Sequence, residues 1–169
     1  MKKTSKLVLC GIIAAIYATL TLALPVIGFG VIQFRLAEAM CVLPFFIPVS
    51  AIGLTVGCLI SNSIGVAMGM TTVLDIVFGT LATAIASFIT IKIRRKAFVP
   101  LPAVVSNAVI IGAMLTYVMS NSIFHPTLLW NMGAIAISQA LSCYCLGLPL
   151  MSLIERIKLP ESFKELKKK

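Results

Sequence analysis

Between residues 97 and 154 the chain contains no aspartate, glutamate, lysine or arginine. A soluble domain does not need an uncharged apolar run of this length. Several membrane-spanning helices do, because each requires about 20 apolar residues. The rest of the composition agrees: 60% of the residues are hydrophobic, 11% are charged, and the mean hydropathy is +1.09. The sequence therefore predicts an all-α integral membrane protein, built as one domain over residues 1–169.

Six apolar segments, separated by turn-forming or charged residues, predict six transmembrane helices. The second segment is short, and Pro44 and Pro48 lie near its end. The last segment is longer than a bilayer requires, so we expect it to be tilted, kinked or partly interfacial, with Gly147 and Pro149 as the break points. The expected helices cover residues 7–24, 34–46, 51–68, 73–93, 101–119 and 127–154, followed by a basic tail over residues 155–169.

The basic residues are confined to three short stretches. Of the 14 lysines and arginines, all except Arg35 lie in residues 2–6, 92–96 or 155–169. Cytoplasmic flanks of membrane helices carry such an excess of positive charge. An even number of helices also places both termini, and the 92–96 connection, on one side. The even number places the termini on the same side, and the lysines at both ends make that side the cytoplasmic one. Because basic and aromatic residues are not interleaved, the net charge of +9 does not indicate a nucleic-acid partner.

Three charged residues lie inside apolar sequence: Arg35, Glu38 and Asp75. A charge inside a membrane is costly and by default marks a functional site. Arg35 and Glu38 are three residues apart and share one face of a helix. They either pair to hold the start of the second helix or contact a polar ligand. Asp75 either accepts hydrogen bonds from the free N–H groups at the start of the fourth helix or joins a site near the external face.

Uncharged polar residues extend the candidate binding site, and each forms either an interhelical hydrogen bond or a ligand contact. They are Gln33, Asn62, Asn107, Asn131 and Gln139. The chain has one histidine and lacks both GxxxxGK[ST] and HExxH motifs. We therefore expect no catalytic residues, no metal, no cofactor and no ATP hydrolysis by this chain itself.

Small residues recur at a spacing of four in the first helix, as Gly11-x-x-x-Ala15 and Ala14-x-x-x-Ala18. This spacing places small side chains on one face and lets a second helix approach closely. The pattern also arises by chance in alanine-rich membrane helices. It indicates a face that the first helix offers to a partner.

Two blocks of the sequence resemble the queuosine-precursor transporter (QueT) family. The first is VIQFRLAEA at residues 31–39 with LPFF at residues 43–46, and the second is DIVFGTLAT at residues 75–83. The two blocks contain all three charges that lie in apolar sequence, and the similarity extends over essentially the whole chain.

The resemblance implies a non-enzymatic substrate-binding subunit, the S component of an energy-coupling factor (ECF) transporter in the plasma membrane. Such a subunit docks through its first helix, here through Ala14-x-x-x-Ala18, on a transmembrane subunit that two cytosolic ATPases drive. The implied substrates are 7-deazaguanine bases, that is, queuine or its precursors. Glu38 or Asp75 can accept hydrogen bonds from the N1–H and the amine of such a base. Arg35 would orient Glu38 or meet the carbonyl of the base.

A stand-alone proton-coupled transporter of a small polar metabolite is the alternative, with Glu38 or Asp75 carrying protons. An intramembrane enzyme or a scaffold is a third possibility, but the sequence contains no recognisable catalytic set. Uptake by this chain alone, dissipated by a protonophore, would favour the proton-coupled transporter.

Overall fold

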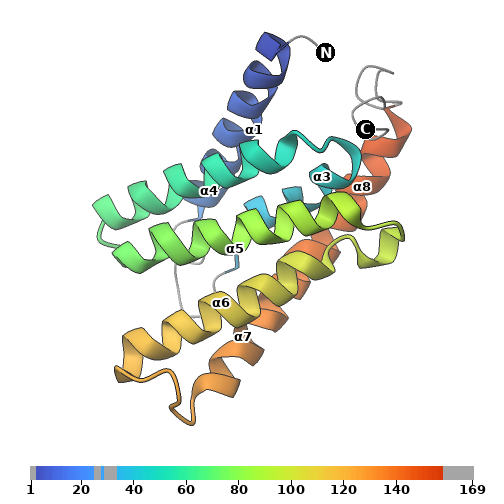
Figure 1. Cartoon of the computed structure of the whole chain (residues 1–169). Helices are drawn as coiled ribbons and strands as arrows, with labels where there is room; N and C mark the ends of the chain where they lie inside the picture. Colours follow the sequence, from blue (N-terminus) through green and yellow to red (C-terminus); the bar gives the residue numbers. More distant parts are fainter. Residues whose placement is uncertain (1–2, 25–27, 29–33, 158–169) are drawn as a thin grey trace.

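The computed structural model describes residues 3–24, 28 and 34–157, and every regular element in these residues is helical. Figure 1 shows the arrangement of the helices. In chain order the elements are α1 (Lys3–Ala23), η1 (Leu36–Val42), α3 (Leu43–Phe46), α4 (Ser50–Ala67), α5 (Val73–Lys92), η2 (Lys96–Phe98), α6 (Leu101–Ser120), α7 (Leu128–Ala140), η3 (Leu141–Leu146) and α8 (Gly147–Arg156).

Five of the six predicted segments form helices that are long and apolar enough to cross a membrane. The second segment does not. It forms seven residues of 3-10 helix in η1 and four residues of α-helix in α3, which together extend about 20 Å, whereas a bilayer core is about 30 Å thick. Of the six predicted transmembrane helices, five are thus long helices, and the second, which was expected to be short, is a short helical segment that does not span a bilayer core by itself. Pro48 follows α3 closely and limits its length, because proline cannot continue the hydrogen-bond ladder.

The long helices pack in chain order: α1 against α4, α4 against α5, α5 against α6, and α6 against α7. Figure 1 shows α4, α5, α6 and α7 as a row in which each helix lies beside the next. The short η1 contacts α1, α5, η3 and α8. It therefore packs against α1, near the start of the chain, against α8, near its end, and against α5 in the row.

Two glycines of α4 allow a close approach to α1. A Cβ atom at Gly53 would lie 2.9 Å from the carbonyl oxygen of Cys10, and one at Gly57 would lie 2.8 Å from the carbonyl oxygen of Ala14. Neither position has room for a side chain. The two helices therefore pack backbone against backbone, as small residues allow in membrane proteins.

The last long helix contains the expected irregularity. The run Leu128–Arg156 is 29 residues long, and residues 141–146 within it adopt a π-helix directly before Gly147. Pro149 cannot donate a hydrogen bond to the carbonyl of Cys145, which favours a local widening of the helix at this point.

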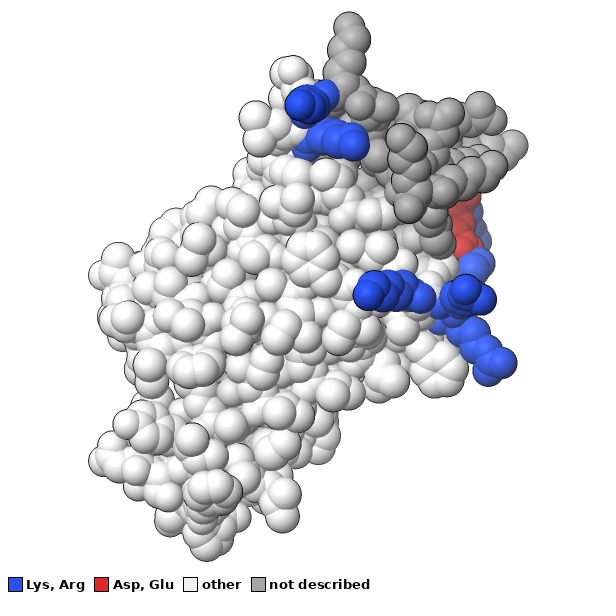
Figure 2. All heavy atoms as spheres, in the orientation of Figure 1, with Lys and Arg blue, Asp and Glu red and all other residues white. Residues whose placement is uncertain are grey.

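The charged surface residues gather at one end of the molecule. Figure 2 shows the lysines and arginines in the upper and right parts of the view, and a broad surface without charge over the rest. The start of α1, the η2 connection and the end of α8 lie toward this end, whereas the α4–α5 and α6–α7 connections lie at the other (Figure 1). An exposed ion pair of 2.6 Å joins Lys96 in η2 to Glu155 in α8. The described surface thus has one basic end and a long apolar body.

Candidate functional site

The three charges found in apolar sequence all lie inside the helical bundle. Arg35 retains 4% of its accessible surface, Glu38 3% and Asp75 3%. Arg35 directly precedes η1, Glu38 is in η1, and Asp75 is in the first turn of α5. The guanidinium Nη2 of Arg35 lies 4.0 Å from Oδ1 of Asp75. The packing of η1 on the start of α5 thus creates a buried cluster with one cation and two carboxylates.

Glu38 has a hydrogen-bond partner that the sequence analysis did not select. The hydroxyl of Tyr17 in α1 donates to Oε1 of Glu38 over 2.8 Å, and both side chains are buried. Among the described residues, none donates a hydrogen bond to Oε2 of Glu38. One carboxylate oxygen is therefore held by the protein, and the other has the capacity to accept from a ligand. The feature of the sequence that could have indicated this partner is the single tyrosine in the apolar first helix.

Asp75 has a different environment, because its side chain closes the start of α5. Its Oδ2 accepts hydrogen bonds from the hydroxyl of Thr71, from the backbone N–H of Thr72 at 3.4 Å and from the hydroxyl of Thr72 at 3.3 Å. Thr72 and Asp75 form a capping box, and Oδ1 faces Arg35. This geometry supports the helix-start role of Asp75 through Oδ2, whereas Oδ1 is buried and accepts no hydrogen bond from the described residues. Contact of Asp75 with a ligand therefore stays a prediction.

Two side chains of the π-helical segment η3 form hydrogen bonds with the backbone carbonyls of Arg35 and Glu38. The hydroxyl of Ser142 donates to the carbonyl of Arg35, and the thiol of Cys143 donates to the carbonyl of Glu38 over 3.6 Å. Nε of Arg35 donates to the carbonyl of Gly28 over 3.0 Å. π-helical turns are frequent at functional sites. Here the turn directs two polar side chains toward η1, so it positions the buried charges.

Of the uncharged candidates, Asn62 lies against the charged cluster. Its Nδ2 donates to the backbone carbonyl of Asp75 over 2.8 Å, and the residue is fully buried in α4. Among the described residues, no group donates to its Oδ1. A buried carbonyl oxygen of this kind is costly unless it accepts a hydrogen bond. Asn62 therefore contributes a second acceptor close to the cluster.

The remaining candidates form hydrogen bonds between helices. Nδ2 of Asn107 donates to Oε1 of Gln139 over 3.1 Å, and this oxygen also lies 3.8 Å from the thiol of Cys143. Nδ2 of Asn131 donates to the hydroxyl of Thr116 over 2.9 Å. These hydrogen bonds join α6 to α7. They correspond to the first of the two alternatives for these residues, an interhelical hydrogen bond rather than a ligand contact. Gln33 lies outside the described residues.

The small residues of α1 divide between two faces. Ala14 and Ala18 are buried, and Ala14 is in contact range of Gly57 in α4, whereas Gly11 and Ala15 are exposed. The first pair thus serves a contact inside this chain, and its small size is explained by the α1–α4 approach. Ala14 and Ala18 are buried within this chain, and docking of a partner on them stays a prediction. The exposed pair Gly11-x-x-x-Ala15 is the one available to a second protein.

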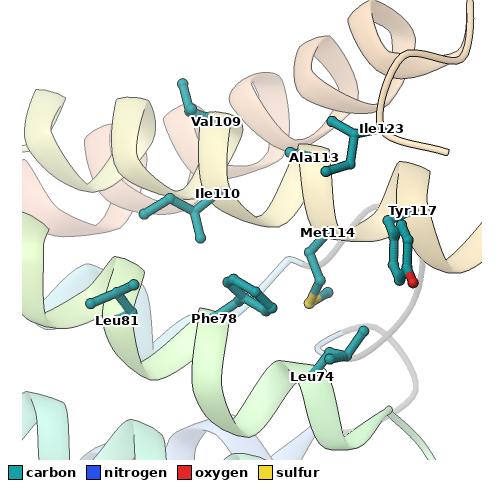
Figure 3. A pocket seen from close by; sticks show the side chains of 9 residues that line it. All are labelled: Leu74, Phe78, Leu81, Val109, Ile110, Ala113, Met114, Tyr117 and Ile123. Atoms are coloured by element: carbon teal, nitrogen blue, oxygen red, sulfur yellow. The ribbon is translucent and has the colours of Figure 1, made fainter.

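An apolar groove of about 560 Å³ lies between α5 and α6, and none of these polar residues lines it. Figure 3 shows side chains of α5 (Leu74, Phe78 and Leu81) facing side chains of α6 (Ile110, Met114 and Tyr117), and the hydroxyl of Tyr117 is the one polar side-chain group of the lining. A ligand with several hydrogen-bonding groups would leave most of them unpaired here, which is unfavourable. The charged cluster is the better candidate for a polar substrate. Within the described part of the chain, no group of three or more His, Cys, Asp or Glu residues is placed to hold a metal ion.

Long apolar helices around a buried cluster of charges define a multi-pass membrane protein with a polar site inside its bundle. The profile of the QueT transporter family matches residues 7–156. This chain therefore belongs to the QueT transporter family, as its two sequence blocks predicted.

A curated relative supports the same assignment. The queuosine precursor transporter QueT of Lactococcus lactis subsp. cremoris (strain MG1363) is 36% identical to this chain over 85 residues. The alignment covers 49% of this chain and 47% of the relative, so the chain spans about half the length of the curated relative that it matches. No solved structure matches the chain.

Proposed function

We propose that this chain is the substrate-binding subunit of an ATP-driven ECF-type importer, and that it binds 7-deazaguanine bases such as queuosine precursors or queuine. Membership of the QueT transporter family supports a role in transport. The name of the Lactococcus relative supports the class of substrate. We place the protein in the plasma membrane, with its basic end in the cytoplasm because positive charge is retained on that side.

The observation that carries the proposal is the buried carboxylate of Glu38 with an oxygen that accepts no hydrogen bond from the described residues. A 7-deazaguanine base presents an N1–H and an exocyclic amine side by side. A carboxylate accepts from both, and such charge-assisted hydrogen bonds are stronger than neutral ones. Oε2 and the remaining lone pair of Oε1 are available for this contact. A base that brings two donors to this position pairs with an oxygen that accepts no hydrogen bond from the described residues.

The neighbouring groups complete the recognition. Asn62 offers a buried carbonyl oxygen to another N–H of the ligand. Arg35 lies at the start of η1 and faces Asp75, so its charge is balanced beside the site. Asp75 supports the site through the start of α5 and through Arg35.

The depth of the cluster agrees with capture from outside the cell. Asp75 is in the first turn of α5, and Lys92 is the last residue of the same helix. The two positions are 17 residues apart (92 − 75), which corresponds to roughly 25 Å along the helix axis. The site therefore lies close to the end opposite the basic one, which under this topology is the external face.

The partners would be an ECF transmembrane subunit and two cytosolic ATPases. The sequence contains no phosphate-binding loop of the GxxxxGK[ST] type, so in this proposal the ATPase subunits supply ATP hydrolysis. The exposed face of α1 around Gly11 and Ala15 is apolar and lined with small residues, which suits close contact with a membrane helix.

A binding screen and an uptake assay together test the proposal. The purified protein is titrated with 7-deazaguanine, queuine, guanine and a pyrimidine vitamin, and we expect saturable binding of the first two. Uptake into proteoliposomes should require the partner subunits and ATP. If this chain alone takes up substrate, and a protonophore abolishes that uptake, the proton-coupled transporter is correct instead. Preference for the pyrimidine vitamin over every deazapurine would overturn the substrate assignment.

A further inference from the structure

A buried hydrogen bond connects α1 to Glu38, the residue whose carboxylate we propose binds the ligand. Tyr17 retains 1% of its accessible surface, and its hydroxyl donates to Oε1 of Glu38 over 2.8 Å. We propose that Tyr17 is a positioning residue that fixes Glu38 with Oε2 directed at the ligand, and that it thereby determines specificity for bases with an exocyclic amine. This inference rests on the proposed function of Glu38.

The packing around Tyr17 leaves its ring little freedom. A Cβ atom at Gly57 of α4 would lie 2.8 Å from Cβ of Tyr17, so the two helices are in contact at this level. The ring belongs to a buried cluster with apolar residues of α1, η1 and α4. The backbone of Tyr17 is also bound, because the hydroxyl of Thr21 donates to its carbonyl over 2.9 Å. The phenolic hydroxyl thus has a position that the α1–α4 contact determines.

Glu38 needs such a restraint, because the terminal torsion of a glutamate is soft and its carboxylate rotates easily. The side chain has an alternative neighbour of opposite charge in Arg35, which contacts Asp75 in this structure. A donor on Oε1 fixes the plane of the carboxylate and leaves Oε2 for the ligand. Such preorganisation favours binding because the ordering cost is met before the ligand arrives.

The inference predicts a change in selectivity and not only in affinity. With the carboxylate plane fixed, N1–H and the exocyclic amine are both aligned with acceptors. Without Tyr17, the carboxylate still attracts one donor but does not hold the geometry for two. A residue that merely supports the fold would weaken the binding of every ligand by the same factor.

The test compares 7-deazaguanine with 7-deazahypoxanthine, which lacks the exocyclic amine, by calorimetry on the full chain. For the wild type we expect 7-deazaguanine to bind about 10- to 100-fold more tightly, as the loss of a charge-assisted hydrogen bond implies. For Tyr17→Phe we expect this ratio to fall by about 5- to 10-fold, mostly through weaker binding of 7-deazaguanine. Tyr117→Phe removes a hydroxyl at an exposed position and should leave the ratio unchanged.

Two outcomes would overturn the inference, and they can be told apart. If wild-type protein binds both bases with the expected preference and Tyr17→Phe keeps that preference, Tyr17 does not position Glu38. If the wild type binds neither base, the proposed function fails, and the inference fails with it. An infrared difference spectrum between the wild type and Tyr17→Phe tests the hydrogen bond between Tyr17 and Glu38 in the ligand-free protein. Removal of the phenol should shift the carboxyl band that is assigned to Glu38 by its loss in Glu38→Gln, and an unchanged band would contradict the hydrogen bond.

Discussion

Replacing Gly57 with alanine tests the close contact between α1 and α4 that places Tyr17. The new Cβ atom would lie 2.8 Å from the carbonyl oxygen of Ala14, 2.8 Å from Cβ of Tyr17 and 3.0 Å from Cα of Ala14. None of these atoms belongs to the far end of a flexible side chain, so none of them rotates away. The contact is relieved only if α1 shifts outward from α4.

The magnitude follows from two opposing effects. Overpacking of a close contact costs about 1–3 kcal/mol. Alanine gains about 0.5–1 kcal/mol over glycine inside a helix, because glycine loses more backbone entropy on folding. We expect a net loss of roughly 1–2 kcal/mol in the free energy of unfolding, which lowers the melting temperature by about 2–8 °C for a chain of this length.

Thermal unfolding in detergent, followed by circular dichroism, measures the effect. Gly11→Ala is the matched control, because no atom lies within 4 Å of a Cβ built at this exposed position of α1. It should melt at or slightly above the wild-type temperature. If Gly57→Ala is as stable as Gly11→Ala, the two helices do not pack as closely as the structure indicates, and the reasoning is refuted.

Three further substitutions address the site and the partner. Glu38→Gln replaces one acceptor with a donor, so calorimetry with 7-deazaguanine should show an affinity about 30- to 1000-fold lower; wild-type affinity would remove Glu38 from the site. Asp75→Asn should change this affinity less than about 5-fold. It should lower the free energy of unfolding by roughly 1–3 kcal/mol, because Arg35 loses a charged neighbour. If Asp75→Asn weakens binding as much as Glu38→Gln does, Asp75 contacts the ligand. Ala15→Leu should keep ligand binding and abolish co-purification with the ECF transmembrane subunit. The control Val8→Leu, also on the exposed surface of α1, should still co-purify with that subunit. If Ala15→Leu assembles normally, the docking surface lies elsewhere.

The amino-acid sequence by itself determined the class of fold and the location of the buried charges. Apolar runs and the scarcity of charge are local properties, and a bilayer-spanning helix satisfies its backbone within its own segment. The five long helices could therefore be predicted without knowledge of their neighbours. Arg35, Glu38 and Asp75 stood out because a charge in apolar sequence is costly wherever the chain folds. The family followed from the same two blocks of residues.

The second segment shows where local composition was insufficient. Residues 34–46 are apolar enough to predict a helix, but they form a 3-10 helix and one α-helical turn. The contacts of η1 with α1, α5, η3 and α8 determine this outcome. Hydropathy reports that a segment avoids water, and it does not report which neighbours hold it or how far it extends.

Only the tertiary structure decided which groups meet at the site. Tyr17 and Glu38 are separated by 21 residues, and Ser142 and Arg35 by 107. No periodicity within one helix predicts such pairs, because they depend on which helix faces are in contact. The same contacts turned Ala14 toward α4 and left Ala15 exposed. They also brought Oδ1 of Asp75 opposite the guanidinium of Arg35. Local chemistry identified the residues that are costly to bury, and long-range packing determined which groups each of them contacts.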